Sequence, residues 1–173
     1  KSLINWKKAR RRPANLNKKI YFCPWIQPDA CMNYLINRHT DPYFNMAFDE
    51  YCLEHEIGDG PLCYLWQNRP AVIVGANQQI HTEVDVDYLK EHDIVLARRV
   101  TGGGAVYHDW GNLNYTIVGE VKEMEHDYPE YACLMQQALC ELGVPATLSG
   151  RNDILVDGLK VSGFAKRVAK GRI

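Results

Sequence analysis

Three consecutive glycines, Gly102 to Gly104, stand close behind two arginines, Arg98 and Arg99, near the middle of the chain. Glycines let the backbone approach a ligand closely and expose several N–H groups, while guanidinium groups add positive charge. The segment is therefore a candidate cradle for an anion, although the glycines alone also fit a flexible connection between strands. It matches neither a Walker loop, which ends in Gly-Lys-Ser/Thr, nor a dinucleotide-binding loop, because no helix pattern follows.

Hydrogen-bonding side chains crowd the next stretch, in Tyr107, His108, Asp109, Asn112 and Asn114. A solvated turn does not require so dense a polar set between two apolar strands. A metal site is the alternative, but an adjacent His and Asp generally cannot both face one ion, and no second His lies at ligand spacing. Nucleophilic catalysis is disfavoured because the segment holds no cysteine and the chain has no Gly-x-Ser-x-Gly motif.

A second polar cluster, Arg151 to Asp153, is followed after a predicted turn by Lys160, Ser162 and Gly163. Strand alternation predicts that Lys160 and Ser162 lie on one face. A lysine in a strand is usually a solvated or edge-guarding charge. Here it stands beside Ser-Gly and opposite the Arg-Asn-Asp run, so an alternative role is to neutralise charge on a phosphate or carbonyl oxygen.

Length and composition set broad limits on the class of protein. The chain has 173 residues, 46% of them hydrophobic and 24% charged, with a net charge of -1. These values predict one ordinary globular domain without a general affinity for nucleic acid or membrane. No apolar run approaches the ~20 residues of a transmembrane helix. The six cysteines form no Cys-x-x-Cys pair, so we expect reduced thiols and a cytoplasmic protein.

The N-terminal segment differs from this even composition, because every charged residue before Asp29 is basic. Such a segment could be a nucleic-acid-binding arm or a targeting leader. It lacks a hydroxyl-rich amphipathic pattern and an apolar core, and Pro13 and Pro24 interrupt it. We therefore expect residues 1–31 to be a disordered extension and residues 32–173 to be the folded domain.

The first half of that domain predicts strand, helix, strand, strand. Residues 32–38 have a strand pattern, and Asp41-Pro42 indicates a helix start that runs to about Glu56. Residues 62–68 and 71–77 read as strands joined by a tight connection. The predicted apolar stripe of the helix comprises Phe44, Ala47, Phe48 and Tyr51.

The second half predicts a short helix over 84–92, strands over 94–98 and 113–118, and a helix with its apolar stripe between Tyr131 and Leu142, ended by Gly143. Asp157-Gly158 between apolar runs indicates a hairpin with a type I′ turn. Strands in hairpins with interleaved helices predict an α+β fold, with a mixed, largely antiparallel sheet flanked by helices.

The run from Arg98 to Tyr115 resembles the signature of the lipoate–protein ligase A family. The resemblance extends from Met32 to the end of the chain. It implies a catalytic domain of the biotin and lipoate ligase type, related to class II aminoacyl-tRNA synthetases. Four further segments carry it: Asp41 to Ala47, Leu65 to Asn68 with Val72 to Gln78, Arg151 to Asp153, and Lys160 to Gly163.

Members of this family use ATP and Mg²⁺ to convert lipoate to lipoyl-AMP, and then transfer the lipoyl group to a lysine of a carrier domain. The resemblance therefore implies lipoate, the lipoyl domains of 2-oxoacid dehydrogenase E2 subunits and the glycine cleavage H protein as partners. Lys160 would be the catalytic lysine, and Asp153 would also hold Mg²⁺. The residues implied along the substrate and adenylate are Asn77, Gln78, Arg99, Gly102, Gly103, Gly104, Tyr107, His108, Asp109, Asn152, Asp153, Ser162 and Gly163.

The chain departs from the family pattern at three places. Ala76 stands where the family usually has an arginine that meets the phosphate, with Arg99 or Arg151 as possible substitutes, and Phe164 replaces a small polar residue. The chain also stops at Ile173, before further family elements, so we expect a catalytic domain truncated at its C-terminus. Two alternatives stay open: an ATP-independent octanoyl or lipoyl transferase between carrier proteins, and a non-catalytic remnant that binds lipoate.

Overall fold

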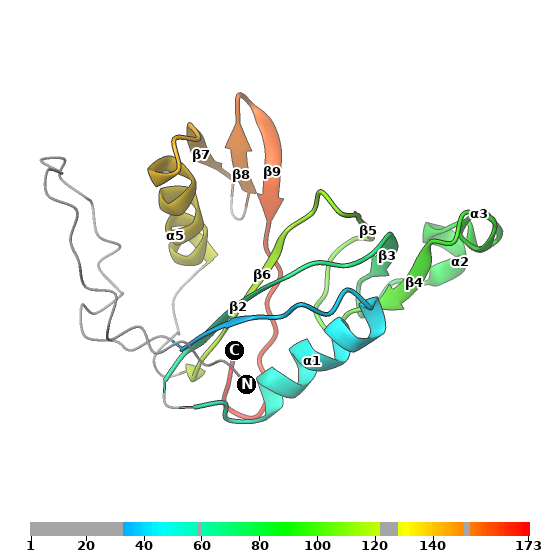
Figure 1. The fold of residues 1–173 in the computed structure, drawn as a ribbon, viewed down its shortest axis with the longest axis horizontal. Helices are drawn as coiled ribbons and strands as arrows, with labels where there is room; N and C mark the ends of the chain where they lie inside the picture. Colours follow the sequence, from blue (N-terminus) through cyan, green and yellow to red (C-terminus); the bar gives the residue numbers. More distant parts are fainter. Residues whose placement is uncertain (1–32, 59, 122–127, 151–152) are drawn as a thin grey trace, which may run out of the picture. The chain divides into compact units, whose positions relative to one another are not determined.

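The computed structural model describes residues 33–58, 60–121, 128–150 and 153–173 (Figure 1). They belong to two compact units. The larger unit comprises Cys31–Met124 with Ala165–Ile173, and the smaller one includes Glu125–Phe164. The basic N-terminal extension predicted for residues 1–31, together with Arg151 and Asn152, lies outside the described residues.

One sheet of the larger unit has the order β1-β2-β6. Its strands are β1 (Asn33–Ile36), β2 (Leu62–Trp66) and β6 (Asn114–Val118). β1 runs parallel to β2, whereas β6 runs antiparallel to it. Because β1 and β2 are parallel, the chain must cross back between them, and α1 (Pro42–Glu54) makes this crossover.

A second sheet of the same unit has the order β4-β3-β5. β3 (Ala71–Val74) pairs in parallel with β4 (Val95–Arg98) and antiparallel with β5 (Val106–His108). Two short helices, α2 (Ile80–Glu83) and α3 (Val86–Glu91), connect β3 to β4. The strands predicted before and after Arg69-Pro70 therefore lie in different sheets and do not form a hairpin.

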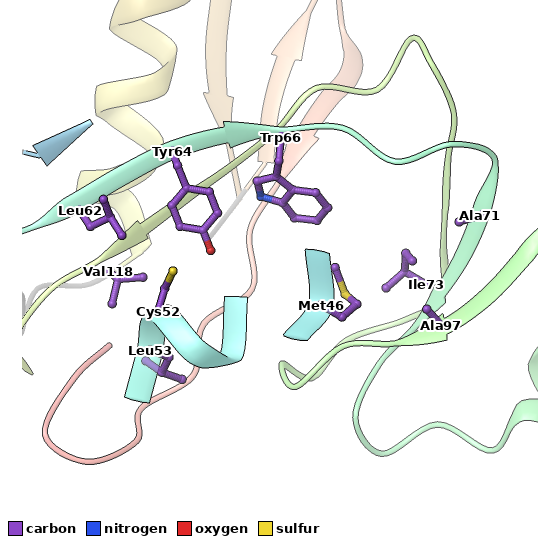
Figure 2. Packing of buried hydrophobic residues seen from close by; sticks show 10 residues of the cluster. All are labelled: Met46, Cys52, Leu53, Leu62, Tyr64, Trp66, Ala71, Ile73, Ala97 and Val118. Atoms are coloured by element: carbon purple, nitrogen blue, oxygen red, sulfur yellow. The ribbon is translucent and has the colours of Figure 1, made fainter. Parts of the chain in front are cut away.

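The hydrophobic core of the larger unit lies between α1 and both sheets. Alternate residues of β2 are buried, and Figure 2 shows Tyr64 and Trp66 pointing toward α1. Burying an aliphatic or aromatic side chain contributes about 1.5–3 kcal/mol, so this packing fixes the helix against the strands. The buried cluster consists of Met46, Cys52, Leu53, Leu62, Tyr64, Trp66, Ala71, Ile73, Ala97 and Val118.

The start of α1 is as predicted, but its buried face is not. The Asp41 carboxylate accepts a hydrogen bond of 2.9 Å from the Phe44 N–H, with Pro42 in the first turn. The predicted apolar stripe was wrong in three of its four members, because Phe44, Ala47 and Tyr51 are exposed and only Phe48 packs against the core. The buried residues are instead Pro42, Asn45, Met46, Cys52 and Leu53.

The smaller unit packs α5 (Tyr128–Glu141) with an antiparallel sheet of β7 (Ala146–Ser149), β8 (Asp153–Val156) and β9 (Leu159–Gly163). Asp157 and Gly158 join β8 to β9 with φ angles of 50° and 77°. Both angles are positive, as the predicted type I′ turn requires. Gly143 ends α5 with a φ of 86°, which confirms the predicted helix end.

The predicted fold class is confirmed: the structure is α+β, and among the described residues four of the six strand pairings are antiparallel. Three details differ from the sequence prediction. The described strands form three separate sheets, the helix expected over 84–92 is shorter and follows a separate turn of helix, and Tyr107 and His108 lie in a strand. Within the described parts of the chain, no helix is long and apolar enough to span a bilayer.

Asp49 should make the stability of the larger unit depend on pH. Its carboxylate accepts hydrogen bonds from the hydroxyls of Tyr64 and Thr116. Burial raises the pKa of Asp49 from 3.8 to about 6, although both hydrogen bonds act in the opposite direction. Because the folded protein then binds this proton more tightly than the unfolded chain, the free energy of unfolding should fall as pH rises from about 4 to 6.

Asp49→Asn should remove the pH dependence that protonation of Asp49 causes. The free energy of unfolding in urea should therefore fall less for this variant than for the wild type over the same pH range. Glu50→Gln is the matched control, because Glu50 is the exposed neighbour in the same helix. Equal pH slopes for Asp49→Asn and the wild type would contradict the assignment.

Candidate functional site

The glycine segment connects β4 to β5 and is held by the Arg99 guanidinium. Arg99 Nη2 donates to the carbonyl oxygens of Gly102 and Gly104 at 2.9 and 2.7 Å, and Nε also donates to Gly102 at 3.3 Å. Its Nη1 donates to the Ile73 carbonyl at 3.0 Å. Burial lowers the pKa of Arg99, but a guanidinium stays charged at neutral pH. One cation therefore ties the loop to β3.

Arg98 holds the loop that follows β3 in the same way. Its Nη1 donates to the carbonyl oxygens of Gly75, Ala76 and Gln78 at 2.7, 3.2 and 2.9 Å. The Gln78 side chain accepts from the Gly75 N–H at 2.8 Å, and the Ala76 N–H donates to the Thr101 carbonyl at 2.9 Å. The two loops are thereby joined to each other.

The four glycines of these loops have different surroundings. A Cβ atom on Gly75 would overlap the Gly103 carbonyl oxygen, and Gly103 has a φ of 102°. Both positions therefore require glycine for the backbone path itself. A Cβ on Gly102 or Gly104 would meet no atom within 4 Å. Open space at these two positions is where a ligand can approach the backbone.

His108 ends β5 and is buried, with 8% of its surface exposed. Its Nδ1 lies 3.1 Å from the Asn68 side-chain nitrogen, and its ring packs edge-on against Trp66. Burial lowers the pKa of His108, the charge of Arg99 lowers it further, and Asp109 partly opposes this. The imidazole is therefore neutral at physiological pH.

The remaining predicted residues around the glycine loop are exposed. Tyr107 precedes His108 in β5 with its side chain in solvent, and Asn77 is exposed in the loop after β3. Asp109 Oδ1 accepts from the Gly111 N–H at 2.8 Å, so this carboxylate shapes the turn after β5. Of Asn77, Tyr107, His108 and Asp109, only His108 has a buried side chain.

In the smaller unit, Lys160 and Asp153 form an ion pair across the β8–β9 hairpin, with an Nζ–Oδ1 distance of 2.8 Å. A Cβ on Gly163 would lie 3.1 Å from Lys160 Cε, so the glycine leaves room for the lysine chain. The pairing shifts register between Ile154 and Leu155, opposite Ser162 and Lys160. This bulge interrupts the regular alternation on which the shared face of Lys160 and Ser162 was predicted.

Asp153, the predicted Mg²⁺ ligand, is the carboxylate that pairs with Lys160 in that hairpin. No group of three or more His, Cys, Asp or Glu side chains in the described chain could hold a metal ion. Mg²⁺ commonly uses one or two carboxylates together with substrate phosphates and water. A single carboxylate is therefore compatible with Mg²⁺ that arrives with a nucleotide.

The structure thus gathers the predicted residues into two groups. Arg99, the glycines, Gln78 and His108 belong to the larger unit, whereas Lys160, Asp153, Ser162 and Gly163 belong to the smaller one. The sequence reasoning gave no role to Asn68 or to the Arg98 contacts. An asparagine directly after a buried strand was the available signal for Asn68, but its partner lies 40 residues away.

Comparison with known proteins gives the family. The model of the lipoyl protein ligase A/B catalytic domain matches residues 41–173, so the chain belongs to this family. Lipoate-protein ligase LplJ of Bacillus subtilis is 44% identical over 135 residues, which are 78% of this chain and 41% of that protein. The chain therefore spans about two fifths of the length of this relative.

Solved structures agree with the fold. Plasmodium falciparum LipL1 in complex with lipoate has a TM-score of 0.73 at 29% identity, over 82% of this chain and 45% of that one. A lipoate-protein ligase A bound with ATP has a TM-score of 0.70 at 31% identity, over 80% and 62%. A bipartite lipoate protein ligase from Thermoplasma acidophilum, studied with its E2 lipoyl domain, gives 0.70 at 32%, over 80% and 57%.

Alanine substitutions should separate the structural glycines from those beside open space. Gly75→Ala should destabilise the larger unit by roughly 1–3 kcal/mol, as overpacking usually does, because the new methyl overlaps the Gly103 carbonyl. Gly104→Ala should leave the melting temperature nearly unchanged and weaken ligand binding. Thermal melts, and calorimetric titration with lipoyl-AMP, the ligand that the family resemblance implies, measure both effects. A Gly104→Ala protein that binds lipoyl-AMP like the wild type would show that the open side of the loop does not contact it.

Proposed function

We propose that this chain carries the catalytic site of an ATP-dependent lipoate–protein ligase. The observation that carries the proposal is the glycine loop, which is held from behind by Arg99 and has open space at Gly102 and Gly104. Backbone that is fixed in this way can lie along an adenylate without reorganising when the ligand binds. Membership of the lipoyl protein ligase A/B family and the ATP-bound structural neighbour support this choice of ligand.

In the first step, a carboxylate oxygen of lipoate attacks the α-phosphorus of ATP. The bond from this phosphorus to the bridging oxygen breaks, and pyrophosphate leaves, so that lipoyl-AMP forms. This reaction needs positioning and charge neutralisation more than a protein nucleophile. The Arg99 guanidinium, which donates to the Gly104 carbonyl, would contribute positive charge close to a phosphate bound along the loop.

Lys160 is the proposed catalytic residue of this step. Its ammonium would neutralise charge on the α-phosphate and on the acyl oxygen of the adenylate. The 2.8 Å ion pair with Asp153 restricts the lysine and supplies a carboxylate beside it. Mg²⁺, which would arrive with ATP, would use the Asp153 carboxylate and the nucleotide phosphates as ligands and offset their negative charge.

In the second step, a lysine amine of the acceptor protein attacks the acyl carbon. The acyl–phosphate bond breaks, AMP leaves, and an amide remains on the acceptor. We propose that the acceptor is a lipoyl domain, either of a 2-oxoacid dehydrogenase E2 subunit or of the glycine cleavage H protein. The structural neighbour that was studied with its E2 lipoyl domain supports the first of these.

Lipoate-dependent exchange of labelled pyrophosphate into ATP, measured with the purified chain, tests the first step directly. Exchange above the lipoate-free background is expected. No exchange, together with acyl transfer from an acylated carrier, would favour a transferase. Binding of lipoyl-AMP without either activity would favour a non-catalytic remnant.

Lys160→Ala should reduce the pyrophosphate exchange rate by at least 100-fold, because a lost electrostatic contact to the reacting group typically costs about 2.7–4 kcal/mol. Circular dichroism should show an unchanged fold, since the Lys160 side chain is largely exposed. Lys90→Ala is the matched control, because Lys90 also pairs with an aspartate, Asp87, and is exposed. Full exchange in Lys160→Ala would remove Lys160 from the mechanism.

Ala76→Arg should strengthen ATP binding by restoring the arginine that the family usually carries. The Ala76 backbone is engaged through its N–H and carbonyl groups, so a longer side chain leaves those bonds intact. A new charge-assisted hydrogen bond of about 1.4 kcal/mol would lower the KM for ATP about ten-fold. Steady-state exchange kinetics measure this. An unchanged KM would show that position 76 does not face the nucleotide.

A further inference from the structure

Four buried polar side chains form a continuous chain through the larger unit. They are Asn37, Asn45, Asn68 and His108, each with no more than 9% of its surface exposed. Asn45 lies in α1, His108 ends β5, and the other two follow β1 and β2. The hydrogen bonds between successive side chains measure 2.8, 2.8 and 3.1 Å. A buried chain of this kind costs stability unless all of its groups are paired.

Backbone groups fix the directions of the Asn37 and Asn45 amides. The His39 N–H can only donate, and it lies 3.0 Å from Asn37 Oδ1, so the Asn37 nitrogen faces Asn45. The carbonyls of His39 and Gln67 can only accept, and both lie within 3.0 Å of Asn45 Nδ2. Asn45 therefore presents its oxygen to Asn37 and its nitrogen to Asn68.

The direction of these hydrogen bonds also determines which His108 nitrogen carries the proton. Since Asn68 Oδ1 accepts from Asn45, the Asn68 Nδ2–H donates to His108 Nδ1 over 3.1 Å. Nδ1 must then be the unprotonated nitrogen, and the ring proton lies on Nε2. In a protonated imidazolium, the Nδ1–H would face the Asn68 Nδ2–H, so two donors would meet without an acceptor. Among the described residues, no side chain or carbonyl accepts from Nε2.

We propose that Asn37, Asn45 and Asn68 are positioning residues that hold His108 as the neutral Nε2–H tautomer, so that Nε2–H can donate to an oxygen of the acyl-adenylate beside the glycine loop. The identity of the ligand rests on the proposed function, whereas the tautomer of His108 follows from the hydrogen bonds alone. A neutral donor binds the acyl oxygen without itself losing a proton to the carboxylate or phosphate.

Nuclear magnetic resonance of the ¹⁵N-histidine-labelled chain tests the tautomer without any substitution. Long-range ¹H–¹⁵N correlations at pH 7 should show the ring of His108, assigned through contacts with Trp66, with an unprotonated Nδ1 and a protonated Nε2. A protonated Nδ1, in either the other tautomer or the imidazolium, would overturn the proposal.

Asn68→Asp reverses the last hydrogen bond with almost no change in volume. The carboxylate can only accept, so His108 Nδ1 must donate to it, and the pKa of His108 should rise. The charged groups that already act on His108 are Arg99, which lowers its pKa, and Asp109, which raises it. Above the raised pKa the neutral ring keeps its proton on Nδ1, and Nε2 can no longer donate.

The pyrophosphate exchange rate of Asn68→Asp should therefore fall about ten-fold relative to the wild type as pH rises through the new His108 pKa, as expected for one lost hydrogen bond. A purely structural role would lower the rate equally at every pH. Asp49→Asn is the control, because it alters another buried polar group of the same core and should leave the His108 tautomer unchanged.

The experiments distinguish failure of the positioning role from failure of the proposed ligase function. Wild-type exchange with a pH profile that Asn68→Asp does not alter would reject the positioning role and keep the ligase. Absence of wild-type exchange would reject the ligase, while the nitrogen spectrum still decides the tautomer. If Asn68→Asp does not fold, the nitrogen spectrum of the folded wild type decides the tautomer by itself, and a protonated Nδ1 there overturns the proposal.

Discussion

Two neighbouring arginines hold the backbone of the candidate site. Arg98 ends β4 and Arg99 follows it, and the two side chains reach two different loops from these adjacent positions. Each guanidinium donates to three backbone carbonyls, and together they fix Gly75 to Gln78 and the glycine loop. The carbonyl dipoles are satisfied by a cation that stays charged, so positive potential remains beneath a loop that could bind an anion. Lysine could not replace Arg99, because the guanidinium donates from three separate nitrogens and an ammonium has one.

A polar network also runs through the core that supports these loops, and Trp66 joins its two parts. The Trp66 Nε1–H donates to Thr116 Oγ1, whose hydroxyl donates to Asp49. The Trp66 ring also packs edge-on against the His108 ring, with ring centroids 6.0 Å apart. Buried polar groups that are fully paired tolerate few alternative packings, so they specify one arrangement of α1 against the strands.

Features decided by a few neighbouring residues could be predicted from the sequence. The Asp41 cap, the Asp157-Gly158 turn and the end of α5 at Gly143 depend on local chemistry, and the structure has all three. The buried face of α1 could not be predicted in this way. Asn45 is polar by type, and only partners on distant segments, such as Gln67 and Asn68, make its burial favourable.

In the candidate site, too, features set by neighbouring residues could be predicted and features set by distant contacts could not. Its glycines could be found because glycine at three successive positions is uncommon outside special backbone paths. The β5 strand was missed because it is three residues long and two of them are exposed, so no apolar alternation marks it. The backbone contacts of Arg99 could not be predicted either, because one of their acceptors, the Ile73 carbonyl, lies 26 residues away in the sequence.

The close approach of Gly75 to the Gly103 carbonyl constrains how this protein can diverge. A side chain can enter position 75 only if the glycine loop takes another path, so changes in the two loops must be acquired together. Position 76 is under no such constraint, because its backbone bonds do not depend on the side chain. Residue 76 can therefore change type while its neighbour stays glycine.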